Sequence, residues 1–199
     1  MKSRLKELLS YNLILASRSP RRQMLMDGLD LSFEIKVKNT KEEYPKGMPY
    51  AEVPAYLSKL KASAFDREQL KANDIVVTAD TIVVLEGQII GKPKSKAEAI
   101  RTLESLSGVK HRVITGVCLT SKLKQHTFSS ESEVYFKELV KEDIDYYVDK
   151  YSPMDKAGAY GIQEWIGYIG IEKIEGSFYN VMGLPTQMLY EELLHFVEK

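Results

Sequence analysis

The segment Ser17-Arg18-Ser19-Pro20-Arg21-Arg22 combines residue types that suit a phosphate-binding site. Ser19 followed by Pro20 is typical of a helix start, because serine caps free N–H groups and proline fits the first helical position. That end of a helix is partly positive, yet the chain places Arg21 and Arg22 there. A bound anion would offset this repulsion, with helix N–H groups, the Ser17 and Ser19 hydroxyls and the arginines converging on phosphate oxygens. Two solvated arginines at a surface turn are the alternative.

Asp80 lies between two strongly apolar segments, 75–77 and 82–85, which are typical of buried strands. We therefore expect its carboxylate at a strand end or break. A desolvated carboxylate costs free energy unless it meets a cation or a metal. The position suits a general base or a metal ligand, and an aspartate that caps a turn is the alternative.

Three lysines lie near the starts of predicted helices and loops. Lys61 is at the edge of the apolar stripe of its helix, Lys92 lies in Gly91-Lys92-Pro93, and Lys156 precedes the small residues Ala157 to Gly161. Such a loop would let a ligand approach the backbone. Surface lysines with their apolar stems on the protein are the alternative. Gln163 follows the loop, and its amide could bind the edge of a base or satisfy backbone groups.

Strand and helix patterns alternate along the chain, which predicts an α/β or α+β domain. We expect strands at 13–16, 33–37, 75–77, 82–85, 88–90, 113–120 and 128–136, with two more around Ile169 and over 179–181. Helices are expected from Pro20 to about Gly28, over 52–70, from a capping box at 95–98 to Ser107, over 140–150 and at the carboxyl end. Met24, Leu25 and Leu29 should face the core.

Composition narrows the classes of function. The 28 Lys and Arg balance the 28 Asp and Glu, so a nucleic-acid or anionic-membrane partner is not favoured. A single cysteine, Cys118, excludes an internal disulfide and favours the cytoplasm. No apolar run approaches a membrane span of about 20 residues, and Met1–Ser10 lacks the apolar core of a secretion signal. The three histidines lack zinc-site spacing, and the common glycine-rich nucleotide loops do not occur.

Five segments follow one another in order between about Leu13 and Leu189: 17–22, Ala79-Asp80-Thr81, Gly91-Lys92-Pro93, 107–111 with 115–117, and Asp155 to Gln163. Together they resemble the signature of the Maf family of nucleoside triphosphate pyrophosphatases. The resemblance implies one elongated α/β domain over residues 1–199, with a mixed sheet and a central cleft between two lobes, similar to inosine triphosphate pyrophosphatases. It also implies metal-dependent hydrolysis of a nucleoside triphosphate to the monophosphate and pyrophosphate.

The resemblance also assigns roles to residues. Asp80 matches the family's catalytic base, and Ser17, Arg21 and Arg22 match its phosphate-binding start. The pocket lysines correspond to Lys61, Lys92 and Lys156. The combination of Arg22, Thr81 and Gln163 resembles the branch that prefers dTTP and UTP over methylated GTP. The implied cofactor is a divalent cation, Mg or Mn.

The chain departs from the family pattern at two places. Where the family has adjacent acidic residues after its second strand, this chain has Lys41-Glu42-Glu43. We assign the metal-binding carboxylate to Glu42, together with Asp80, and Glu43 is the register-shifted alternative. Many members have a small residue after Gln163, but Glu164-Trp165 follow here. Trp165 could narrow the base pocket or face outward at an interface.

These assignments lead to one mechanism and two rival functions. Asp80 would orient or deprotonate a water that attacks the α-phosphorus, and metal binding is its second-ranked role. One rival is a nucleotide-sensing regulator of septum formation, and the other is a house-cleaning pyrophosphatase that prefers purines. A homodimer is compatible with the family, and neither nucleic acid nor a membrane is expected as a partner.

Overall fold

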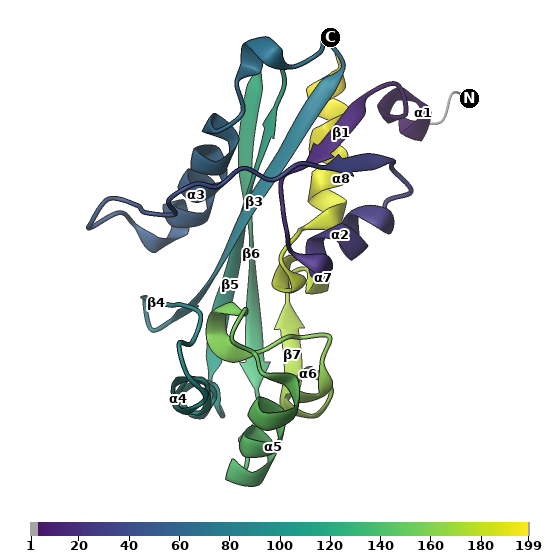
Figure 1. Ribbon diagram of the computed structural model, residues 1–199. Helices are drawn as coiled ribbons and strands as arrows, with labels where there is room; N and C mark the ends of the chain where they lie inside the picture. Colours follow the sequence, from purple (N-terminus) through teal and green to yellow (C-terminus); the bar gives the residue numbers. More distant parts are fainter. Residues whose placement is uncertain (1–3, 199) are drawn as a thin grey trace. The chain divides into compact units, whose positions relative to one another are not determined.

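The computed structural model describes residues 4–198 and contains a seven-stranded mixed sheet (Figure 1). The strand order is β2-β1-β3-β5-β6-β7, and β4 pairs with β3 off this path. β1 runs parallel to β2 and β3, whereas β4 and β7 are antiparallel to β3 and β6. This confirms the predicted mixed α/β class. The strands are β1 (Asn12–Leu15), β2 (Phe33–Ile35), β3 (Asp74–Leu85), β4 (Gln88–Ile90), β5 (Lys110–Thr120), β6 (Gln125–Phe136) and β7 (Ile171–Glu175).

Helices alternate with these strands through most of the described chain. They are α1 (Arg4–Leu8), α2 (Pro20–Asp27), α3 (Val53–Ser63), α4 (Lys96–Leu106), α5 (Lys141–Tyr151), α6 (Trp165–Gly170), α7 (Phe178–Met182) and α8 (Thr186–Val197). Short 3-10 segments are η1 (Tyr50–Glu52), η2 (Arg67–Gln69) and η3 (Ala157–Ala159). No described helix is long and apolar enough to cross a membrane.

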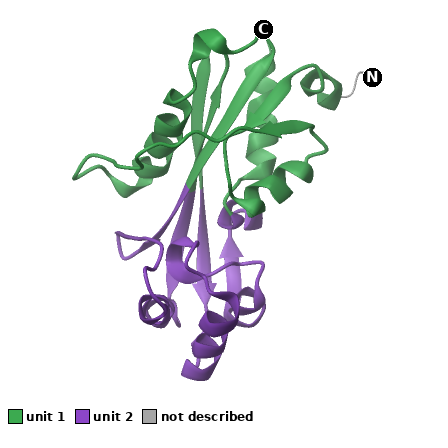
Figure 2. Cartoon of the chain, viewed as in Figure 1, with its two compact units in different colours: residues 1–80, 115–130, 183–199 green, residues 81–114, 131–182 purple. Residues whose placement is uncertain are grey.

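The chain divides into two compact units (Figure 2). Unit 1 consists of Met1–Asp80, Thr115–Ser130 and Gly183–Lys199, and unit 2 consists of Thr81–Ile114 and Glu131–Met182. Strands β3, β5 and β6 contribute residues to both units. The single domain with a central cleft stays a prediction, and its end residues 1 and 199 lie outside the described residues.

Unit 1 is built around β1, whose Leu13, Ile14 and Leu15 are all buried. A continuous apolar run is expected for a strand that has parallel neighbours on both sides and is covered on both faces. The start of α3 packs very closely on β5 at Gly116. A Cβ there would lie 2.3 Å from both the Ala55 nitrogen and the Pro54 carbonyl carbon, so only glycine permits this approach.

Unit 2 has its own apolar cluster, formed by Val83, Val113 and Val134 with Ile90 and Ile171 packed against it. The hairpin between β3 and β4 turns at residues 86 and 87, which both have positive φ, as expected for a tight two-residue turn.

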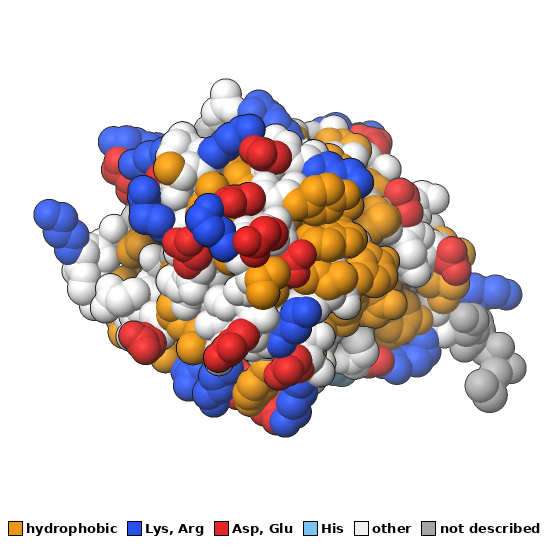
Figure 3. Space-filling model, turned by 90° about the horizontal axis from the view of Figure 1, so that it is seen from below, with side chains coloured by type: hydrophobic (Ala, Val, Ile, Leu, Met, Phe, Trp, Pro, Cys, Tyr) orange, Lys and Arg blue, Asp and Glu red, His pale blue; other side chains and the backbone are white. Residues whose placement is uncertain are grey.

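Basic and acidic side chains intermingle on the face shown in Figure 3, beside an area of hydrophobic side chains.

The sequence predicts that Asp80 lies at a strand end or break, and this prediction is wrong. Asp80 lies within the continuous strand β3. Thr78, Ala79 and Asp80 are all buried there. The polar interruption is tolerated because its groups are hydrogen-bonded: Thr78 donates its hydroxyl to the Ser58 carbonyl, and Asp80 accepts from a lysine. The strand β3 therefore continues through the polar residues at which the side-chain pattern indicates a strand end.

Other local predictions need correction. The helix expected over 52–70 ends at Ser63 and is followed by η2, where the Asp66 side chain accepts a hydrogen bond from the Glu68 N–H. Ile169 lies in α6 rather than in a strand, and the strand expected over 179–181 is α7, because Ser177 Oγ caps the Asn180 N–H. Met24 is 52% exposed, and Met26 is buried in its place.

The buried His111 should make the stability of the fold depend on pH. His111 is 2% exposed, its Nε2 lies 2.8 Å from the Tyr160 hydroxyl, and burial lowers its pKa from 6.5 to about 4. Between these values the unfolded chain binds more protons, so the free energy of unfolding should fall as the pH decreases from about 6.5 to about 4. The loss is at most about 3.5 kcal/mol, at roughly 1.4 kcal/mol per pKa unit.

Urea denaturation at pH 7.5, 6.0 and 4.5 checks this prediction. In His111→Gln the free energy of unfolding should fall less between these pH values. In the control His195→Gln, at an exposed position, it should fall as much as in the wild-type chain. An equally steep decrease in His111→Gln would contradict the assignment.

Candidate active site

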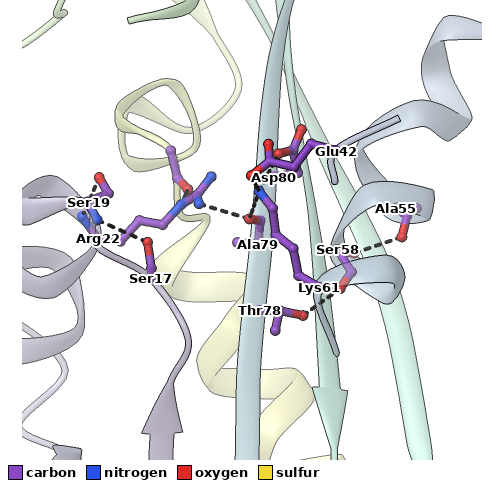
Figure 4. A network of polar contacts seen from close by, with 11 residues as sticks. Ser17, Ser19, Arg22, Glu42, Ala55, Ser58, Lys61, Thr78, Ala79 and Asp80 are labelled. Atoms are coloured by element: carbon purple, nitrogen blue, oxygen red, sulfur yellow. Dashed lines mark hydrogen bonds and ion pairs between the residues drawn. The ribbon is translucent and has the colours of Figure 1, made fainter. Parts of the chain in front are cut away.

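The first predicted feature, a capped start of α2, is confirmed. Ser19 is the N-cap residue with extended backbone angles, and its Oγ accepts a hydrogen bond from the Arg22 N–H at 3.5 Å. Pro20 occupies the first helical position, and Ser17 Oγ accepts from the Ser19 N–H at 3.2 Å. Both hydroxyls therefore lie at the amino end of α2 (Figure 4).

Arg22 extends from α2 to the polar part of β3. Its Nε donates to the Gly183 carbonyl and its Nη1 to the Ala79 carbonyl, both at 2.8 Å. Burial lowers the pKa of this guanidinium, while the charge of Asp80 opposes that effect. Arg22 is thus not a solvated surface arginine. Its planar fork fixes a positive charge beside the Asp80 segment.

Lys61 joins two carboxylates in unit 1. Its Nζ lies 2.6 Å from Asp80 Oδ1 and 3.3 Å from Glu42 Oε1, and it also donates to the Ala79 carbonyl at 3.3 Å. The Lys61 and Asp80 side chains are only 16% and 11% exposed, whereas that of Glu42 is 51% exposed. Figure 4 shows Lys61 rising from α3 toward the two acids.

The adjacent residues Glu42 and Glu43 have different ion-pair partners. Glu43 forms an ion pair with Lys41 at 2.8 Å, and its side chain is 68% exposed. Glu42, and not Glu43, therefore shares a lysine with Asp80. The interpretation of Asp80 as a plain turn cap is wrong, because the residue lies within a strand and meets a cation.

Unit 2 holds a second lysine between two carboxylates. The Lys156 side chain is 9% exposed, and its Nζ lies 2.8 Å from Asp155 Oδ1 and 3.1 Å from Glu164 Oε1. The Tyr147 hydroxyl donates to Glu164 Oε2 and accepts from the Gly161 N–H at 3.0 Å. Lys156 is therefore not a surface lysine.

The remaining predicted residues of unit 2 differ in their surroundings. Lys92 is exposed, but the adjacent Gly91 carbonyl accepts from the Gly158 N–H at 3.3 Å, which places this turn next to η3. Gln163 is half-buried, and its Oε1 is buried without a hydrogen-bond partner in the described chain. Thr81 is half-buried in β3, directly after Asp80.

The predicted residues are divided between the two units. Unit 1 contains Ser17, Ser19, Arg21, Arg22, Glu42, Lys61 and Asp80, and unit 2 contains Thr81, Lys92, Lys156 and Gln163. Arg21 belongs with the residues of unit 1, because its charge helps to lower the pKa of Arg22.

Trp165, one of the two residues that depart from the family pattern, packs against Tyr146 of α5. The ring centroids are 4.9 Å apart and the rings are nearly perpendicular. The sequence marks Glu164 only as unusual, and its contact with Lys156 was not predicted. The carbonyls of Ala79 and Gly183 were also missed, since main-chain acceptors carry no signal of residue type.

Comparison with known protein families identifies the relationship. The family described as Maf-like protein matches residues 12–196. The chain belongs to this family. Proteins named dTTP/UTP pyrophosphatase are similar over nearly the full length: 48% identical over 98% of both chains in Porphyromonas gingivalis W83, and 52% identical over 92% of this chain and 95% of the relative in Bacteroides thetaiotaomicron.

A third relative, from Parabacteroides distasonis, has the same name and is 51% identical over 96% of this chain and 100% of its own length. Among solved structures, the Ham1 protein of Staphylococcus aureus matches at 15% identity with a TM-score of 0.49, over 91% of this chain and 99% of that one. Similarity to the inosine triphosphate pyrophosphatases stays a prediction.

Removing the Lys61 ammonium should destabilise this Maf protein through Asp80. Lys61→Met leaves a nearly buried carboxylate without its closest cation, which should cost about 2–3 kcal/mol of unfolding free energy. Asp80→Asn in the same chain should restore part of that loss. Breaking the exposed pair of Lys96 and Asp149 by Lys96→Met should cost under about 0.5 kcal/mol. Denaturant titrations of the wild-type chain and the three variants measure each value, and equal losses for Lys61→Met and Lys96→Met would contradict the prediction.

Proposed function

We propose that this Maf protein hydrolyses dTTP and UTP to the monophosphate and pyrophosphate. The relatives of that name, which match nearly the whole chain at about half identity, carry the proposal. Within this proposal, we assign each group that such a reaction needs to residues predicted from the sequence. We treat residues 1–199 as one functional domain that acts in the cytoplasm, where the buried thiol of Cys118 would stay reduced. A homodimer stays a prediction.

The first requirement is to offset the substrate's charge. A triphosphate carries about four negative charges, which repel an attacking oxygen until cations offset them. The cations that we assign to this task are Arg21, Arg22, Lys61, Lys92 and Lys156. Arg22 is suited to it because two carbonyls fix its guanidinium in place.

The second requirement is a divalent cation. No group of three or more His, Cys, Asp or Glu among residues 4–198 forms a ready metal cage. Mg²⁺ does not need one, since it is commonly held by one or two carboxylates together with substrate phosphates. Asp80 and Glu42, which meet at Lys61, fit this donor set. Such an ion would add charge neutralisation at the phosphates.

The third requirement is a group that accepts a proton from water. We assign this role to Asp80, whose Oδ1 is held by Lys61 and whose backbone is fixed within β3. Its Oδ2 would take a proton as the water oxygen bonds to the α-phosphorus. The bond from the α-phosphorus to the bridging oxygen breaks, and pyrophosphate leaves with that oxygen. Lys61 keeps the carboxylate oriented throughout.

We assign recognition of the substrate's nucleobase to Gln163, Thr81 and Arg22. Gln163 Oε1 is a buried acceptor without a partner in residues 4–198, and a buried acceptor of this kind is costly to leave unsatisfied. Thymine and uracil both carry an N3–H donor that could satisfy it. Recognition through this one group would let the site accept a nucleotide of either base.

The substrate assignment is tested with equal concentrations of dTTP, UTP, ITP and methylated GTP, each with Mg²⁺, Mn²⁺ or EDTA. Pyrophosphate release should be fastest with dTTP and UTP and absent in EDTA. Gln163→Ala should reduce kcat/KM for dTTP by roughly 10-fold or more, because a base-edge hydrogen bond is lost. A purine preference would refute the pyrimidine assignment, and binding without turnover would favour a nucleotide sensor.

The role of Asp80 is tested by Asp80→Asn. This variant should still bind the triphosphate but lose turnover by roughly 10² or more, the usual scale for a positioned acid–base group. Calorimetric binding of a non-hydrolysable dTTP analogue separates binding from chemistry. Glu43→Gln, which changes a neighbouring exposed carboxylate, is the control and should keep its turnover. Normal dTTP hydrolysis by Asp80→Asn would exclude Asp80 as the base.

A further inference from the structure

Glu164 occupies a specific place between a lysine and a buried tyrosine. Its Oε1 lies 3.1 Å from Lys156 Nζ, and its Oε2 accepts from the Tyr147 hydroxyl. Tyr147 is fully buried, and the Gly161 N–H donates to its hydroxyl at 3.0 Å. Glu164 is thereby anchored on one side to the rigid helix α5, and it presents its other oxygen to Lys156.

The two carboxylate partners of Lys156 are not equivalent. The Asp155 side chain is 59% exposed, whereas that of Glu164 is 19% exposed. An exposed ion pair is screened by water and restrains a flexible lysine only weakly. The less exposed Glu164, itself anchored by Tyr147, is the partner that can hold the long lysine side chain in one position.

The glycine at position 161 makes room for this contact. A Cβ on Gly161 would lie 2.7 Å from Glu164 Cδ and 2.9 Å from Glu164 Oε2. Any side chain at 161 would therefore push the carboxylate out of its place. The local backbone and the Glu164 side chain fit one another, so the Lys156–Glu164 contact is a built feature of the loop and not a chance surface pairing.

We propose that Glu164 is a positioning residue that holds the Lys156 ammonium ready for the substrate's phosphates, and that Tyr147 orients Glu164. This inference rests on the proposed function, because it takes Lys156 to be a phosphate ligand. Glu164 itself does not touch the substrate. A lysine that is fixed before binding loses less conformational freedom when the triphosphate arrives, so its contribution is to affinity.

Steady-state hydrolysis of dTTP by the full chain tests the proposal. Glu164→Gln keeps the shape and an acceptor for Tyr147 but removes the charge beside Lys156. It should raise KM by roughly 10-fold and change kcat by less than about 3-fold. Tyr147→Phe should raise KM by a smaller factor, about 3-fold, because it removes only the orienting hydroxyl.

Glu175→Gln is the matched control. Glu175 also contacts a lysine, Lys173, and the tyrosine hydroxyl of Tyr135, but it is exposed on β7. The KM of Glu175→Gln for dTTP should equal that of the wild-type chain.

A double-mutant cycle distinguishes positioning from general support of the fold. In a Lys156→Met background, Glu164→Gln should change KM by less than about 2-fold, because its effect passes through the lysine. An equal increase in both backgrounds would overturn the proposal, and so would an unchanged KM in Glu164→Gln. If the wild-type chain does not hydrolyse dTTP at all, the proposed function fails and this inference fails with it. If the wild-type chain hydrolyses dTTP and Glu164→Gln has the same KM, only the positioning role is refuted and the proposed function stands.

Discussion

The Lys61 ammonium makes an acidic residue possible inside a largely apolar, buried strand. Asp80 lies within β3, whose other residues are largely buried, and its carboxylate would be expensive there without a cation 2.6 Å away. Lys61 reaches it because α3 packs against β5, an approach that requires glycine at 116. The candidate catalytic group thus depends on a packing contact in a different strand. Its position is set by the core of unit 1.

Lys156 repeats this chemical arrangement in unit 2. Each lysine has one partner that is largely buried, Asp80 or Glu164, and one that is more exposed, Glu42 or Asp155. The buried carboxylate fixes the ammonium, and the exposed one is the easier to solvate or to displace. A chain with no net charge can in this way keep cations in fixed positions for an anionic ligand. The acids that accompany them prevent a broad basic surface, which would attract other polyanions.

Local sequence rules succeeded where the relevant interactions are local. The Ser19 cap of α2 is confirmed, and so are the β3–β4 hairpin and the Ser95 Oγ contact with the Glu98 N–H that begins α4. These features depend on neighbours within a few residues. The same reasoning failed at Asp80, where a contact from elsewhere in the chain outweighs the side-chain pattern. At 179–181 a local signal was overlooked, the Ser177 cap of a short helix. Side-chain pattern cannot show which carbonyl or ammonium will satisfy a buried group.

By itself the sequence determined the mixed α/β class, the helix start that carries Arg21 and Arg22, and the family to which the chain belongs. These follow from residue type and spacing along the chain. Only the tertiary structure decided that Glu42, and not Glu43, shares Lys61 with Asp80, and that Arg22 is held by two carbonyls. It alone paired Glu164 with Lys156. Each of these contacts joins side chains or carbonyls whose distance is set by how strands, helices and loops pack, and the spacing of residues in a sequence does not encode that distance.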